Sequence, residues 1–171
     1  MLRRIGATVR AACIVASLLL AFGTGEQRAL ADPASSPSAA TTLELTIVGG
    51  PALNPNTEGR PSPVVVRVFD LAASRNFEGA DYQALFEQPN DLLKQDVVAQ
   101  EELLLRPGDI QERSRTLSPQ VHALGIAAAF RDLDRAVWRL TVPLKPGRRN
   151  FLLIDLDKNT VRLDTGDSGR P

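Results

Sequence analysis

Cysteine is almost absent from this sequence, which restricts both cross-linking and thiol chemistry. The only one is Cys13, near the start of an apolar run that covers residues 11–22. The chain after that run therefore holds no thiol for a disulfide, a metal site or a nucleophile. A lipid-accepting cysteine follows the apolar run of its signal, whereas Cys13 precedes most of it, so we expect no lipid anchor on this residue.

Histidine is equally scarce, because His122 is the only one in the chain. One histidine cannot supply a zinc site, which needs several nitrogen or sulfur ligands. It could act as the base for a serine nucleophile, but no nucleophile elbow surrounds any serine. We interpret His122 as a surface residue before a strand, and we predict no enzyme activity, no catalytic residue, no metal site and no cofactor.

Carboxylates occur in close pairs, a pattern found in two-carboxylate enzymes and in calcium sites. The pairs are Glu101 with Glu102, Asp132 with Asp134, and Asp155 with Asp157. Adjacent residues of a strand point to opposite faces, which separates the first pair. The spacing and the glycine of an EF-hand are absent. We therefore interpret these carboxylates as solvated residues at strand ends.

Aromatic residues make up only 5% of the chain, so its core must consist mainly of Val, Leu, Ile and Ala. Trp138, the only tryptophan, is interpreted as a packing anchor.

The chain has no excess of positive charge. Its formal net charge is zero, and residues 32–171 are net negative. Proteins that bind nucleic acid present clustered Lys and Arg to the phosphates, so we expect no nucleic-acid partner.

The first 31 residues have the three parts of a secretory signal peptide. Arg3, Arg4 and Arg10 precede the apolar run of residues 11–22, and small residues at Ala29 and Ala31 follow it. A membrane-spanning helix needs about 20 apolar residues, more than this run contains. We predict that residues 1–31 are a signal peptide cleaved before Asp32. An uncleaved membrane anchor is the alternative.

The remaining chain is predicted to form one β domain at residues 43–163, between a flexible leader at residues 32–42 and a flexible tail at residues 164–171. Seven or so short strands are expected from eight candidate segments, several with alternating apolar and polar residues. They fall at residues 43–47, 64–71, 101–105, 112–117, 123–130, 137–142, 151–156 and 160–163. A helix is expected at residues 77–87, capped by Asn76 and ended by Pro89. The pattern favours a mainly β, two-sheet β-sandwich with one inserted helix.

The segment of residues 49–63 interrupts this pattern with four prolines and three glycines. Such a composition excludes a helix or a central strand. We predict a long exposed loop, and loops of this length in compact domains are often functional.

Three stretches resemble the type VI secretion lipoprotein family, called TssJ, VasD or SciN. The first is LNPN at residues 53–56 followed by GRPSPVVVRVFDL at residues 59–71, and the second is the aromatic-flanked segment of residues 77–86. The third is LGIAAAFRD at residues 124–132 with Trp138 and Arg139 shortly after it. The resemblance spans nearly all of residues 43–163.

The resemblance implies a transthyretin-like sandwich in the periplasmic part of a type VI secretion membrane complex. The implied partner is the periplasmic C-terminal region of a large inner-membrane protein, TssM, and other outer-membrane-associated secretion components are further candidates. The family carries an acylated N-terminal cysteine that this sequence lacks, so the expected location is the periplasm, with any association with the outer membrane made through partners.

The contact element implied by the family is the loop of residues 49–63. Its expected contact residues are Pro51, Leu53, Asn54, Pro55, Asn56, Glu58 and Arg60, the polar ones as hydrogen-bonding groups and the others as apolar contacts. The alternative function is a periplasmic carrier that holds a small ligand on the same fold. A deep pocket with convergent polar groups would favour the carrier.

Overall fold

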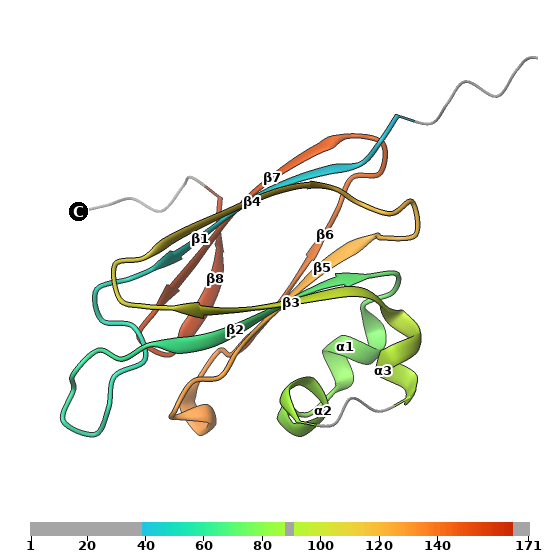
Figure 1. Ribbon diagram of the computed structural model, residues 1–171. Coiled ribbons are helices and arrows are strands. Elements are labelled where there is room, and N and C mark those ends of the chain that lie inside the picture. The colour runs from blue at the N-terminus through green and yellow to red at the C-terminus, as the bar shows by residue number, and fades with distance from the viewer. Residues whose placement is uncertain (1–38, 88–90, 166–171) are drawn as a thin grey trace, which may run out of the picture. The chain divides into compact units, whose positions relative to one another are not determined.

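The computed structural model describes residues 39–87 and 91–165, and these form two four-stranded sheets packed face to face (Figure 1). The strand order is β4-β1-β7-β8 in one sheet and β3-β2-β5-β6 in the other. The strands are β1 (Thr42–Gly49), β2 (Val64–Leu71), β3 (Val97–Leu105), β4 (Ile110–Thr116), β5 (Ala123–Ala128), β6 (Arg139–Pro143), β7 (Arg149–Asp157) and β8 (Thr160–Asp164). The prediction of a mainly β, two-sheet sandwich is confirmed.

Strand β1 shows why the sequence forms this architecture. Leu43, Leu45 and Ile47 are at most 1% exposed, while the residues between them are half-buried, so one face of the strand lies in the core. β1 pairs antiparallel with β4 and parallel with β7. All other ladders are antiparallel.

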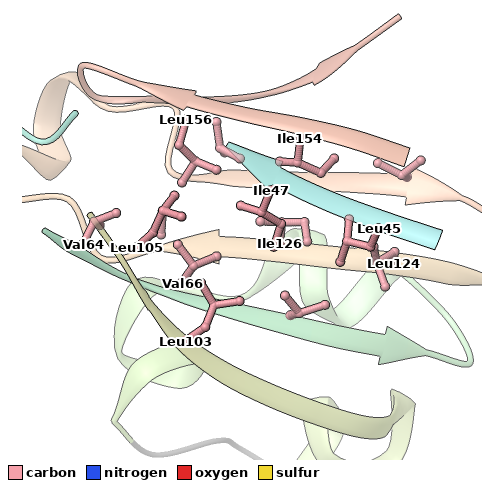
Figure 2. Packing of buried hydrophobic residues seen from close by; sticks show 14 of the residues in the cluster. Leu45, Ile47, Val64, Val66, Leu103, Leu105, Leu124, Ile126, Ile154 and Leu156 are labelled. Carbon is pink, nitrogen blue, oxygen red and sulfur yellow. The ribbon is translucent and has the colours of Figure 1, made fainter. Parts of the chain in front are cut away.

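The core between the sheets is built almost entirely from aliphatic side chains, as the low aromatic content predicts. Figure 2 shows Leu45 and Ile47 of β1 near Leu124 and Ile126 of β5, with all four side chains in the interior. Phe130 is the one aromatic residue among the buried members of this cluster in the described part of the chain. Trp138 is half-buried and packs against this cluster and against a second one under the helices, consistent with its role as an anchor.

The expected single helix at residues 77–87 is wrong in detail, because the segment forms two short helices, α1 (Arg75–Gly79) and α2 (Tyr82–Phe86). Ala80 and Asp81 between them are extended. The cause is Asp81, whose carboxylate accepts a hydrogen bond of 2.8 Å from the Ala84 N–H and so begins a new helix. Asn76 lies inside α1 and is not its cap, while Pro89 lies outside the described residues.

A third helix, α3 (Asp91–Asp96), leads directly into β3, which begins four residues before the expected start of that strand. The three helices lie beside the sheet that contains β2 (Figure 1). Phe77 and Leu85 are fully buried and pack with Phe69 of β2 in the second cluster. Gly125 of β5 makes this packing possible, since a Cβ there would lie 2.8 Å from the Phe77 ring.

The ends of the domain extend slightly beyond the expected range. Thr41 is buried, its carbonyl accepts from the Leu117 N–H, and β1 begins at Thr42. At the other end, β8 continues to Asp164. The expected signal peptide and most of the expected leader and tail lie outside the described residues. Within residues 39–87 and 91–165, no helix is long and apolar enough to cross a membrane.

Candidate functional site

Three chain segments that are far apart in the sequence meet at one end of the sandwich. They are the β1–β2 loop, the segment between β5 and β6, which contains the short 3-10 helix η1 (Leu133–Arg135), and the β7–β8 turn. Figure 1 shows the β1–β2 loop and the η1 segment at this same end.

Asn54 connects all three segments through hydrogen bonds. Its backbone N–H donates to the carbonyl of Lys158 in the β7–β8 turn at 2.7 Å. Its side-chain Nδ2 donates to the carbonyl of Pro63 at 2.7 Å, and its Oδ1 accepts from the backbone N–H of Arg131 at 2.9 Å. Asn54 has φ of 47° and Lys158 has φ of 52°. Asparagine tolerates this left-handed conformation better than most residues, which suits it to this position.

The base of the loop is fixed against β7. The Asp157 carboxylate accepts from the Ala52 N–H at 3.0 Å, and the Gly50 N–H donates to the Leu156 carbonyl at 2.7 Å. A Cβ on Gly50 would lie 2.4 Å from Asp157 Oδ1, so only glycine fits here. Leu53 is completely buried and belongs to the core between the sheets. The loop therefore begins as part of the core.

The tip of the loop is held in shape by one side chain. Asn56 Oδ1 accepts from the backbone N–H groups of Glu58 at 3.0 Å and Arg60 at 2.9 Å, and the Asn56 N–H donates to the Arg60 carbonyl at 2.9 Å. Glu58 and Arg60 also form an ion pair with each other. Gly59 supplies the positive φ of 77° that the turn requires. The tip is thus exposed and ordered by internal hydrogen bonds.

The structure corrects two of the seven predicted contact residues. Pro51, Glu58 and Arg60 are exposed, and Pro55 and Asn56 are half-buried. Leu53 and Asn54 were also expected on the surface, but their exposed fractions are 0% and 2%. Leu53 fills the core and Asn54 bonds three segments together, so neither side chain is available to a partner.

An open hollow of about 640 Å³ lies between the loop and the other two segments. The residues that line it are Pro55, Asn56, Thr57, Arg131, Asp132, Arg135 and Asn159. Sequence reasoning missed Arg131, Arg135 and Asn159 as site residues. Arg131 lies in the stretch of residues 124–132 that carries the family resemblance, but nothing in that stretch marks it as a contact residue. The grouping of the three residues depends on strand pairings that bring residues about a hundred positions apart together.

Two polar residues that the sequence offers as site candidates, Asp155 and His122, are not among the residues that line the hollow. Asp155 forms an ion pair with Arg162 on the neighbouring strand at 2.5 Å, and the bond to this carboxylate raises the pKa of the Arg162 guanidinium. His122 is exposed immediately before β5, as expected. Within the described ranges, no group of three or more His, Cys, Asp or Glu side chains is arranged to hold a metal ion.

A cluster of cations and aromatic rings near α2 is likewise structural. Arg139 donates to the carbonyls of Phe77 at 2.9 Å and Ala80 at 2.6 Å, which supports the break between α1 and α2. Burial lowers the pKa of the Arg139 guanidinium from its ordinary value, an effect opposed by the nearby Glu78 charge. Tyr82 lies edge-on to Trp138 with ring centroids 5.9 Å apart. Burial, followed by the Glu87 charge, raises the pKa of the Tyr82 hydroxyl.

Comparisons with known proteins found a matching family model and several similar solved structures. A family model described as "Type VI secretion lipoprotein, VasD, EvfM, TssJ" matches residues 41–159. The T6SS lipoprotein TssJ1 from Pseudomonas aeruginosa is 36% identical, with a TM-score of 0.71 over 73% of this chain and 95% of that one. A comparison with curated proteins gave no match.

Two further solved structures contain similar chains. One, described as "Type VI membrane complex", holds a chain 35% identical with a TM-score of 0.65, covering 72% of this chain and 97% of that one. The other, described as "T6SS protein TssM C-terminal domain (869-1107) from EAEC", matches at 34% identity with a TM-score of 0.61, over 71% of this chain and 99% of that one.

Proposed function

The chain belongs to the type VI secretion lipoprotein family of VasD, EvfM and TssJ, and from this premise we propose that it binds the periplasmic C-terminal region of a TssM-like inner-membrane protein. Family membership makes it a TssJ-like structural component of a type VI secretion system. The proposed binding assigns it a place in the periplasmic part of the membrane complex of that system.

The observation that carries the proposal is the ordered β1–β2 loop. Its base is anchored by Leu53 and Asn54, and its tip from Asn56 to Arg60 is closed by hydrogen bonds of Asn56. A loop that is already ordered loses little conformational entropy when it docks, which favours binding. The exposed prolines Pro51 and Pro61 restrict the backbone further.

The descriptions of the related structures support the same partner. One similar chain belongs to a structure described as a type VI membrane complex, and another to a structure described by a TssM C-terminal domain. The two similar chains match 72% and 71% of this chain and nearly all of their own length.

The carrier alternative is less well supported by the packing. In the described part of the chain, the space between the sheets is occupied by interlocking aliphatic side chains (Figure 2). The hollow among the loops is open to solvent and lies outside that core. A surface of this kind suits a protein partner better than an enclosed small ligand.

The test is a binding measurement between the purified protein and the periplasmic C-terminal region of the TssM-like protein from the same cell. The tip variant Glu58→Ser/Arg60→Ser removes an exposed ion pair without changing net charge. Its matched control is Glu44→Ser/Arg149→Ser, which removes the partly exposed Arg149–Glu44 pair on the outer face of the β4-β1-β7-β8 sheet. We expect the tip variant to bind at least tenfold more weakly and the control variant to bind like the wild type. Equal binding by the tip variant and the wild type would exclude the tip as a contact.

A further inference from the structure

We propose that the hollow beside the β1–β2 loop receives an acidic side chain of the TssM-like partner, with the Arg131 guanidinium as its counter-ion. This inference rests on the proposed function and names the chemistry of the contact.

The backbone of Arg131 is hydrogen-bonded to the β1–β2 loop, while the residue is exposed to solvent. Its backbone N–H is fixed by Asn54 Oδ1 at 2.9 Å, so the start of its side chain has a defined position. The residue is exposed and lines the hollow. Among residues 39–87 and 91–165, no carboxylate forms an ion pair with its guanidinium. A guanidinium is well suited to a carboxylate because it can donate two parallel hydrogen bonds.

The other charged groups around the hollow are matched in pairs. Arg135 lies 3.8 Å from Asp132, measured from Nε to Oδ2. Glu58 and Arg60 pair with each other on the adjacent tip. The charge left without a counter-ion in the lining of the hollow is therefore the positive charge of Arg131, which gives the hollow a preference for an acidic group.

Asn159 is half-buried and also lines the hollow. Its Oδ1 is buried and has no hydrogen-bond donor in the described part of the chain, although its backbone carbonyl accepts from the Val137 N–H at 2.9 Å. Most buried polar atoms have a partner, and one left without a donor lowers stability. This oxygen is enclosed by the protein, so a partner segment in the open hollow does not reach it, and Arg131 carries the recognition.

The charge of Arg131 and the size of the hollow define the ligand. The hollow, of about 640 Å³, has room for more than one side chain. Arg131 contributes its charge from the β5–β6 segment, so the partner segment must carry an aspartate or glutamate. Charge-assisted hydrogen bonds of this kind are stronger than neutral ones.

The experiment measures the affinity of charge variants for the partner's periplasmic C-terminal region. Arg131→Glu should weaken binding at least tenfold, because it replaces the attraction to the partner's carboxylate by repulsion between like charges. Arg131→Lys should weaken it less, because the charge remains. The matched control is Arg148→Glu, the same change at an exposed arginine before β7, at the opposite end of β1. The control should bind within twofold of the wild type.

Two further readouts separate a binding role from a folding role. Raising the salt concentration should weaken wild-type binding and affect Arg131→Gln less, because the screened interaction is already absent. The melting temperature of Arg131→Gln should equal that of the wild type, because the exposed Arg131 side chain forms no ion pair within the described residues.

The outcomes distinguish this inference from the proposed function. If the wild type binds, the tip variant binds weakly and Arg131→Glu behaves like Arg148→Glu, the acidic-group inference is wrong and the proposed function stands. If the wild type does not bind the partner region at all, both are wrong. If Arg131→Glu loses binding but has also lost its folded circular-dichroism spectrum, Arg131→Gln and Arg131→Lys decide, and equal affinity of both with the wild type overturns the inference.

Discussion

The side-chain oxygen of Asn54 accepts a hydrogen bond from the backbone N–H of Arg131, 77 residues further along the chain. This bond joins the β1–β2 loop to the segment after β5. The same asparagine also bonds to Pro63 and Lys158, so one residue fixes the relative positions of three loops. Asn54 itself is buried beneath the surface on which a partner would dock.

Asn54→Ala should lower the free energy of unfolding by about 2–3 kcal/mol, because it leaves the buried groups that bonded to the side chain without partners. Urea denaturation measures this change. Asn56→Ala serves as the control, since its side chain bonds only within the exposed tip and its loss should cost less than about 1 kcal/mol. Equal stability of Asn54→Ala and the wild type would contradict the bridging role.

Leu53→Ala should destabilise the protein by about 2–5 kcal/mol, the usual cost of truncating a fully buried leucine. This prediction separates the loop into an anchored base and a free tip. Glu58→Ala, at the exposed tip, should change stability by no more than about 0.5 kcal/mol. Thermal unfolding of both variants provides the comparison, and a tolerant Leu53 would mean that the loop base is not part of the core.

Gly125→Ala should lower stability by about 1–3 kcal/mol, because its Cβ would lie 2.8 Å from the Phe77 ring in a close-packed region. Gly79→Ala is the matched control. It adds the same methyl group at the end of α1, where no other atom lies within 4 Å. We expect the control to be neutral or slightly stabilising, since alanine favours helix more than glycine does.

The mature protein should begin at Asp32. This expectation rests on the basic start, the short apolar run of residues 11–22 and the small residues Ala29 and Ala31. N-terminal sequencing of the protein from a periplasmic extract tests it. Recovery of only the uncleaved chain, in the inner membrane, would favour the anchor interpretation.

Labelling of cells with radioactive palmitate should leave this protein unlabelled. Cys13 is the only thiol in the sequence and lies within the expected signal peptide. A label that disappears in the Cys13→Ser variant would show that this cysteine is acylated after all. A known acylated lipoprotein in the same cells provides the positive control.

The strands could be predicted from the sequence because their burial follows from local patterns. The alternation of Leu43, Leu45 and Ile47 and the β-branched run that starts at Val64 both correspond to strands of the structure. The break in the predicted helix was missed because Asp81 competes for helix N–H groups, an effect that a hydrophobic pattern does not show.

The site was less predictable, for a physical reason. Proline and glycine indicate an exposed loop, and this holds for the tip but not for Leu53, which turns into the core. The grouping of Arg131 and Asn159 with the loop depends on long-range strand pairing. Such pairing cannot be derived from the neighbours of either residue in the sequence.

The parallel pairing of β1 with β7 has a consequence for the order in which the chain can fold. β1 is a central strand, and its two neighbours, β4 and β7, come from residues 110–116 and 149–157. A chain that emerges from a ribosome or a translocation channel N-terminus first presents Leu43, Leu45 and Ile47 long before their partners arrive. Folding dominated by such distant contacts is slow and leaves apolar strands unprotected in the meantime. Until the last third of the chain has been released, this strand depends on the surroundings, and on any holding chaperone there, to stay free of aggregation.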